Sequence, residues 1–215
     1  RGRPPSPNCP PRGCGPPPSG PVVRVRPWEG VDTADGPRFV AELETHEVQV
    51  LRNMATSIQE MLDDRQAAAP TDPLEQITGI RTGNSAPPQD ATLSRLLPDF
   101  VAEQPGHPAD ASANGALRSL HEPAIIDAKI AAAQRILDTL PRDAGRIALT
   151  EADAEAWIAA VNDLRLALGT MLGIGPDFPD RLPPKHPKAM HHDVYLWLTL
   201  LQEYLVLGLM GKPGR

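Results

Sequence analysis

The chain has 215 residues, of which 26 are proline and two are cysteine, and its net charge at pH 7 is −6. Two cysteines are too few for a disulfide-rich secreted scaffold. Ten of the prolines and both cysteines fall within residues 1–28, where a packed core cannot form. We therefore predict a disordered Pro/Gly/Arg-rich tail over residues 1–27 and a single helical domain over residues 28–212.

The charge divides at the same place. Residues 1–28 contain five arginines and no acidic residue, so the tail carries +5 and the rest of the chain −11. The arginines are Arg1, Arg3, Arg12, Arg24 and Arg26. Phosphate binding requires clustered basic residues, so an acidic domain is a poor DNA binder. We therefore expect contact with DNA only indirectly or through this tail. Neither a signal peptide nor a membrane span is apparent, which predicts a cytoplasmic protein that does not contact a membrane.

The first half of the domain reads as helices separated by proline-rich segments. Arg38–Leu43 is a short extended stretch, and Thr45 is a plausible N-cap for a helix that ends near residues 65–69. The apolar stripe of this helix is Val48, Leu51, Ala55, Ile58 and Leu62. Capping residues predict a brief helix from Asp72 to Gly79, and another short helix is expected over Thr92–Leu97.

The second half continues this pattern. A loop is expected over residues 101–115, then a short helix at Ala116–His121 and a separate helix that begins at Pro123 and ends before Pro141. Arg146–Leu149 is extended and leads into a helix capped by Thr150 and ended by Gly173. The last helix, His191–Met210, is apolar almost all round, which favours a place at the centre of a bundle.

These elements predict a mainly all-α fold, in which four main helices and several short ones form a compact bundle. Both extended stretches directly precede a capped helix, so we expect them to pair as a small two-stranded β-ribbon.

Motifs for catalysis and for cofactor or metal binding are absent from the sequence. There is no dinucleotide fingerprint, P-loop, zinc-binding His motif or nucleophile elbow. In His191-His192-Asp193 the two imidazoles diverge on a helix, so the cluster favours a polar helix start over a metal site. Asp63-Asp64-Arg65 is typical of a solvated helix end, and Trp197, Leu201, Leu205 and Gly208 are typical of core packing. We predict no catalytic residue, no metal, no cofactor and no enzymatic activity.

Cys9 and Cys14 are the candidate redox pair. Four residues separate them, and Gly13 allows the turn that a disulfide requires. Arg12 favours the reactive thiolate, and an exposed pair on a flexible tail would be readily reduced. The alternative is that both cysteines are incidental, because residues 1–24 also resemble a translated GC-rich leader.

Several blocks of the domain resemble a family of actinobacterial proteins of unassigned function that includes an actinomycete oxidative-stress transcriptional regulator. The blocks are DGPRF (35–39), MLDDR (61–65), DPLEQITGI (72–80), LSRLLPDF (93–100), ALRSLHEPAIIDAK (116–129), LTEADAEAWIAAVNDLRLALGTMLGI (149–174) and YLWLTLLQEYLVLGLM (195–210). The resemblance implies a redox-responsive regulator that contacts a sigma factor or RNA polymerase. It also implies a link to genes for cysteine biosynthesis and for a Clp adaptor.

Two alternatives remain open. One is a non-enzymatic protein-interaction module tied to Clp proteolysis, which the family neighbourhood implies. The other is a helical domain that binds a small molecule in a polar pocket formed by Asp127, Asn162, Arg165 and Gln202. For a protein partner, the candidate surface segments are Gln76–Arg81 and Ser119–Glu122.

Overall fold

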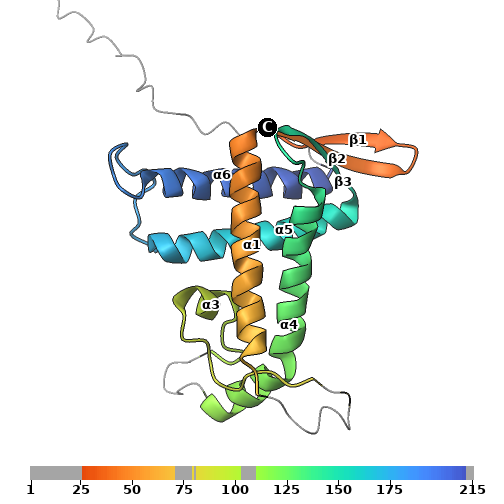
Figure 1. Cartoon of the computed structure of the whole chain (residues 1–215). Coiled ribbons are helices and arrows are strands. Elements are labelled where there is room, and N and C mark those ends of the chain that lie inside the picture. Colours follow the sequence, from red (N-terminus) through yellow and green to blue (C-terminus); the bar gives the residue numbers. More distant parts are fainter. Residues whose placement is uncertain (1–25, 71–78, 80, 103–109, 212–215) are drawn as a thin grey trace, which may run out of the picture.

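The computed structural model describes residues 26–70, 79, 81–102 and 110–211. Within these residues the chain forms five helices and one three-stranded antiparallel sheet (Figure 1). In chain order the elements are β1 (Glu29–Thr33), β2 (Gly36–Leu43), α1 (Thr45–Ala67), α3 (Ala91–Leu96), α4 (Ala111–Thr139), β3 (Gly145–Leu149), α5 (Glu151–Leu172) and α6 (Ala189–Leu209). The predicted helix from Asp72 to Gly79 lies almost wholly outside the described residues. The expectation of a mainly helical fold with four long helices is confirmed.

Helix α5 is the centre of the domain. It packs against α1, α3, α4 and α6 and also contacts β2 and β3. Trp157 on α5 is fully buried, its indole N–H donates to Thr139 Oγ1 at 2.8 Å, and its ring meets Trp28 edge to face. Such pairs add to the free energy gained from burial of their large apolar surfaces.

The prediction that the last helix lies at the centre is wrong. Helix α6 packs chiefly on α5, which separates it from the lower half of the molecule in Figure 1. One side of α6 is buried, through Trp197, Leu198, Leu201 and Leu205, while apolar residues such as Leu196 and Leu200 are only half-buried. The uniformly apolar sequence therefore reflects a helix with one buried side and one half-buried apolar side.

The two extended stretches do pair, as β2 and β3, with Phe39 opposite Leu149 and Leu43 opposite Gly145. The prediction of only two strands is wrong, because β1 adds to the other edge of β2. A tight turn at Ala34 and Asp35 joins β1 to β2, and Gly36 follows it with a φ of +102°, which glycine adopts without strain.

Helix ends follow the predicted chemistry with one difference. At α5, Thr150 and Asp153 form a capping box and Gly173 ends the helix in the left-handed conformation, as predicted. At α1 the N-cap is Glu44, and not the predicted Thr45. Glu47 Oε2 accepts from the Glu44 N–H at 2.7 Å, so a capping box built on glutamates begins this helix.

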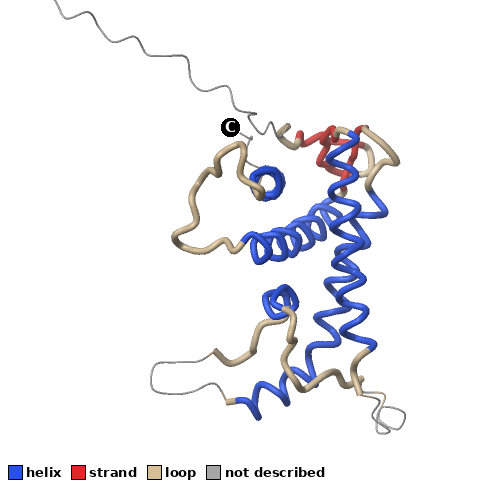
Figure 2. The backbone as a smooth tube through the Cα atoms, turned by 60° about the vertical axis from the view of Figure 1, so that its left-hand side comes forward, coloured by secondary structure: helices blue, strands red, loops and turns tan. Residues whose placement is uncertain are grey.

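Helix α4 corrects two further predictions. It is one helix of 29 residues that begins at Ala111, capped by Asp110, and Pro123 lies inside it. Residues 111–115 are therefore helical and not part of a loop, and Pro123 does not begin a new helix. Figures 1 and 2 show the first turns of α4 running at an angle to the rest, as expected where proline interrupts a helix.

Candidate functional site

The candidate site lies where residues 81–86 cross the bend of α4. Proline lacks the N–H that would bond to the carbonyl four residues earlier, which here belongs to Ser119. The N–H of Gly83 donates to this carbonyl oxygen at 2.7 Å. Glycine fits closely at position 83, because the Cβ of any other residue would lie 2.9 Å from Cδ and Cγ of Pro123 unless one of the two segments shifts. A distant segment of the chain thus supplies the hydrogen bond that Pro123 cannot make.

A buried ion cluster lies beside this contact. Glu122 and Arg118 are each 2% exposed, and Arg118 Nη1 donates to Glu122 Oε2 at 2.7 Å. Arg65, from the last turn of α1, donates to the other oxygen of Glu122 at 2.8 Å. Arg118 also bonds to Asp99 Oδ1 at 2.6 Å and to the carbonyl of Leu97 at 3.1 Å. Since both carboxylate oxygens of Glu122 meet a guanidinium, its burial costs less than that of an unpaired charge.

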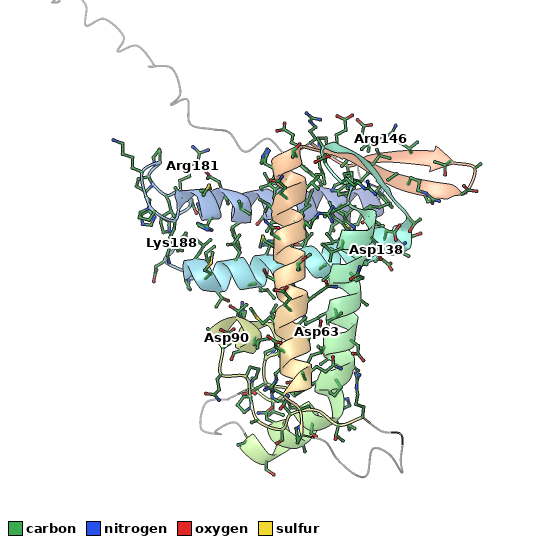
Figure 3. All side chains as sticks on the ribbon, in the orientation of Figure 1. Asp63, Asp90, Asp138, Arg146, Arg181 and Lys188 are labelled. Carbon is green, nitrogen blue, oxygen red and sulfur yellow. The ribbon has the colours of Figure 1, made fainter. Side chains whose placement is uncertain are left out.

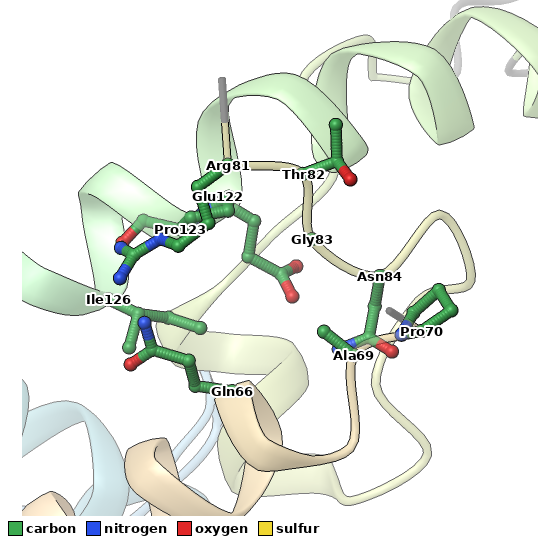
Figure 4. Close-up of a pocket in the computed structure, with 10 residues that line it drawn as sticks. All are labelled: Gln66, Ala69, Pro70, Arg81, Thr82, Gly83, Asn84, Glu122, Pro123 and Ile126. Carbon is green, nitrogen blue, oxygen red and sulfur yellow. The ribbon is translucent and has the colours of Figure 1, made fainter. Parts of the chain in front are cut away.

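Residues 81–86 are fixed to α1 by the same arginine. Arg65 Nη2 donates to the carbonyl of Ala86 at 2.6 Å, and Asn84 Nδ2 donates to the carbonyl of Arg65 at 2.9 Å. At the outer edge, Arg81 bonds to the carbonyl of Pro123 and pairs with Asp127. These elements line a small, partly open pocket of about 160 Å³ between Gln66, Arg81, Asn84 and Glu122 (Figure 4).

The chemistry of this junction is structural. Its three arginines face three carboxylates, and none of the buried side-chain polar atoms in the described residues lacks a hydrogen-bond partner. It therefore holds α1, α4 and residues 81–86 in one arrangement. At its rim Leu120 is 52% exposed, and His121 meets the ring of Phe100 at 5.9 Å. This rim is therefore the part of the junction that can contact another molecule.

The two segments predicted as a partner surface meet here in part. Arg81 contacts the α4 bend and Ser119 accepts from Gly83, whereas residues 76–78 and 80 lie outside the described residues. Ser119 is half-buried and Leu120 and His121 are exposed, but Glu122 is buried and cannot belong to a contact surface. Sequence reasoning missed the cluster of Arg65, Arg118 and Glu122. The available signal was the spacing of Arg118 and Glu122, which places them one turn apart on a helix.

In the described part of the chain, the four residues predicted to line one polar pocket are not brought together. Arg165 and Gln202 do meet, because Arg165 Nη1 donates to Gln202 Oε1 at 2.6 Å, and this bond joins α5 to α6. Asp127 is instead at the α4 bend with Arg81, and Asn162 lines none of the described cavities. The cavity that Arg165 lines, between α5 and Tyr195 of α6, includes none of the other three residues.

The other candidate residues from the sequence have structural roles. His192 is buried against Phe178 and Tyr195, whereas the neighbouring His191 is exposed, so the two imidazoles diverge as predicted. Asp63 and Asp64 are exposed at the end of α1. Within the described residues, no group of three or more His, Cys, Asp or Glu side chains is placed to hold a metal ion. Trp197, Leu201 and Leu205 are core residues, and Gly208 packs against Phe39.

Two further carboxylates, both on α5, are buried and paired with basic residues of α4. Burial raises the pKa of the Asp163 carboxyl above its ordinary value, against the opposing effect of the Lys129 ammonium 2.6 Å away. For Asp153, burial also acts to raise the pKa, but hydrogen bonds from Arg135 and Thr150 outweigh it and the pKa is lowered. The two groups therefore make opposite contributions to the pH dependence of stability.

Cys9 and Cys14 lie outside the described residues, as does most of the basic tail. Arg26 is described, and it pairs with Glu42 of β2 at 2.6 Å. Among the described helices none combines the length and the apolar character needed to cross a membrane.

Comparison with known proteins identifies the family. The model of a domain of unknown function, DUF2017, matches residues 25–209, a range that excludes both cysteines. The oxidative stress regulators AosR of Mycobacterium tuberculosis and Mycobacterium bovis are each 58% identical to this chain over 195 residues, which cover 87% of this chain and 89% of theirs. No solved structure matches. The chain belongs to the DUF2017 family and is a homologue of the mycobacterial oxidative stress regulators named AosR.

Proposed function

We propose that this protein is a redox-responsive transcriptional regulator of the oxidative-stress response, which acts by contacting a sigma factor or RNA polymerase. The observation that carries the proposal is the 58% identity to proteins named oxidative stress regulators, over most of both chains. Those relatives are named as regulators and not as enzymes.

The charge distribution supports contact with the transcription machinery over direct reading of DNA. Outside the first 28 residues the chain carries −11, and sequence-specific DNA binding depends on clustered Lys and Arg. The arginines of the α4 junction, Arg65, Arg81 and Arg118, are each paired with a carboxylate, so they offer no basic surface. Any contact of this chain with DNA falls to the basic tail.

We assign the redox response to Cys9 and Cys14, because they are the only cysteines of the chain. Oxidation would join the two sulfurs in a disulfide and reduce a peroxide to water and alcohol, or hydrogen peroxide to two waters. The tail that carries both cysteines precedes β1, which forms one edge of the sheet. Control of genes for cysteine biosynthesis is the expected output of such a regulator.

The test measures binding of the full chain to RNA polymerase carrying a stress sigma factor, with dithiothreitol or with hydrogen peroxide. We expect the affinity to differ by at least about fivefold between the two conditions, the lower range of known coupling between sites. The Cys9→Ser and Cys14→Ser variants should bind equally in both. If the native chain binds equally in both conditions, the thiol switch is wrong. If the native chain binds in neither condition, the proposed contact with RNA polymerase or its sigma factor is wrong.

A further inference from the structure

A methionine-lined groove runs along the flank of α1 opposite α4. Its walls come from α1, α5, the start of α6 and Thr92 of α3, and it has a volume of about 540 Å³. Four of the chain's five methionines line it, namely Met54, Met61, Met171 and Met190. Met171 is 54% exposed and Met190 is 72% exposed, which is unusual for large apolar side chains. Methionine is adaptable and recurs on surfaces that bind apolar segments of other proteins.

The dimensions of the groove fit an α-helix. Its α1 wall runs from Val50 to Met61, so at 1.5 Å per residue it extends about 16 Å, or three turns. Its α1 residues recur at three- and four-residue steps and so present the ridges against which another helix packs. Helix α4 already packs on the other flank of α1 (Figure 1).

The charged residues around the groove indicate where its occupant carries the opposite charge. Asp64 is exposed one turn beyond Met61, and Asp90 is exposed two residues before Thr92 of the groove wall. Among the ion pairs of the described residues, none includes either carboxylate. Lys188 lies at the other end, where it bonds to the carbonyl of Leu172 next to Met171. Figure 3 shows Asp90 beside α3 and Lys188 beside the start of α6.

We propose that this groove binds an amphipathic helix of the partner protein, with apolar residues toward the methionines and a basic residue facing Asp64 and Asp90. The proposal rests on the proposed function, since the partner is the sigma factor or polymerase assigned there. Three turns of apolar contact supply the affinity, and the two carboxylates outside any described ion pair fix the direction in which the helix lies.

The test uses the full chain and RNA polymerase with a stress sigma factor, in the redox state that binds more tightly. The Met171→Asp and Met190→Asp variants should fold normally, because both side chains are exposed, and each should weaken binding by at least about tenfold. Met210→Asp is the matched control, since Met210 is 60% exposed but lies outside the groove, and it should bind as the native chain does. A photocrosslinker at position 171 should attach to a helical partner segment that carries a Lys or Arg.

Several results would overturn the groove while leaving the proposed function intact. One is native binding by both methionine variants. Another is loss of binding in Leu120→Asp alone, which would place the contact at the rim of the α4 junction. A crosslink within the chain, or to a second copy of it, would assign a different occupant. If the native chain binds no polymerase, the proposed function fails and the groove proposal fails with it.

Discussion

The contact between Gly83 and Pro123 makes the sharpest prediction about stability. Replacing Gly83 with alanine places a Cβ 2.9 Å from two ring carbons of Pro123, well inside ordinary van der Waals contact. Moving the segment outward to relieve the overlap lengthens the 2.7 Å bond from the Gly83 N–H to the Ser119 carbonyl by a similar amount. Overpacking costs about 1–3 kcal/mol and the hydrogen bond about 0.5–1.5 kcal/mol, so Gly83→Ala should lower the free energy of unfolding by roughly 2–4 kcal/mol.

A double-mutant cycle separates this mechanism from general damage. In Pro123→Ala the ring carbons are absent and the backbone N–H of the new alanine can itself donate to the Ser119 carbonyl. Gly83→Ala should therefore cost less than about 1 kcal/mol in that background. Urea unfolding followed by tryptophan fluorescence measures all four chains, because Trp28 and Trp157 are buried. An equal cost of Gly83→Ala in both backgrounds would show that overlap with the Pro123 ring does not cause the destabilisation.

Three other substitutions test the buried charges. Glu122→Gln leaves Arg65 and Arg118 close together without their shared carboxylate, so it should lower the free energy of unfolding in urea by about 3 kcal/mol. A decrease below about 1 kcal/mol would show that the cluster is well solvated. Because the pKa of Asp163 is raised in the folded state, the native chain binds an extra proton just above the ordinary aspartate value of about 3.9. Its free energy of unfolding therefore falls as pH rises through that window, and Asp163→Asn should remove this fall. The lowered pKa of Asp153 has the opposite sign, so its stabilisation is lost as pH falls below about 3.9 and should be absent in Asp153→Asn. A pH series of urea unfolding curves that is unchanged by either substitution would contradict the assignment.

The sequence predicted the elements whose signals are local. The apolar stripe of α1 and the capping residues of α5 each lie within one helix, and each is confirmed. Strand β1 was missed because its five residues, Glu29–Thr33, are exposed or half-buried and show no clear alternation of apolar and polar residues. The pattern of apolar and polar residues therefore could not indicate a strand there.

The misreading of α4 has a different cause. Proline normally begins or interrupts a helix, so Pro123 predicted a boundary. What permits the helix to continue is the N–H of Gly83, 40 residues earlier in the chain, and such a contact is visible only in three dimensions. The candidate site was hidden for the same reason, because Arg65 of α1 meets Glu122 of α4 only after folding.

The proposed function is tested most directly by transcription with purified RNA polymerase from a promoter that depends on a stress sigma factor, with and without this protein, under reducing and oxidising conditions. We expect that adding the protein changes transcript yield in a redox-dependent way and that Cys9→Ser abolishes this dependence. Transcript yield that is unaffected by the protein in both conditions would contradict the proposed function.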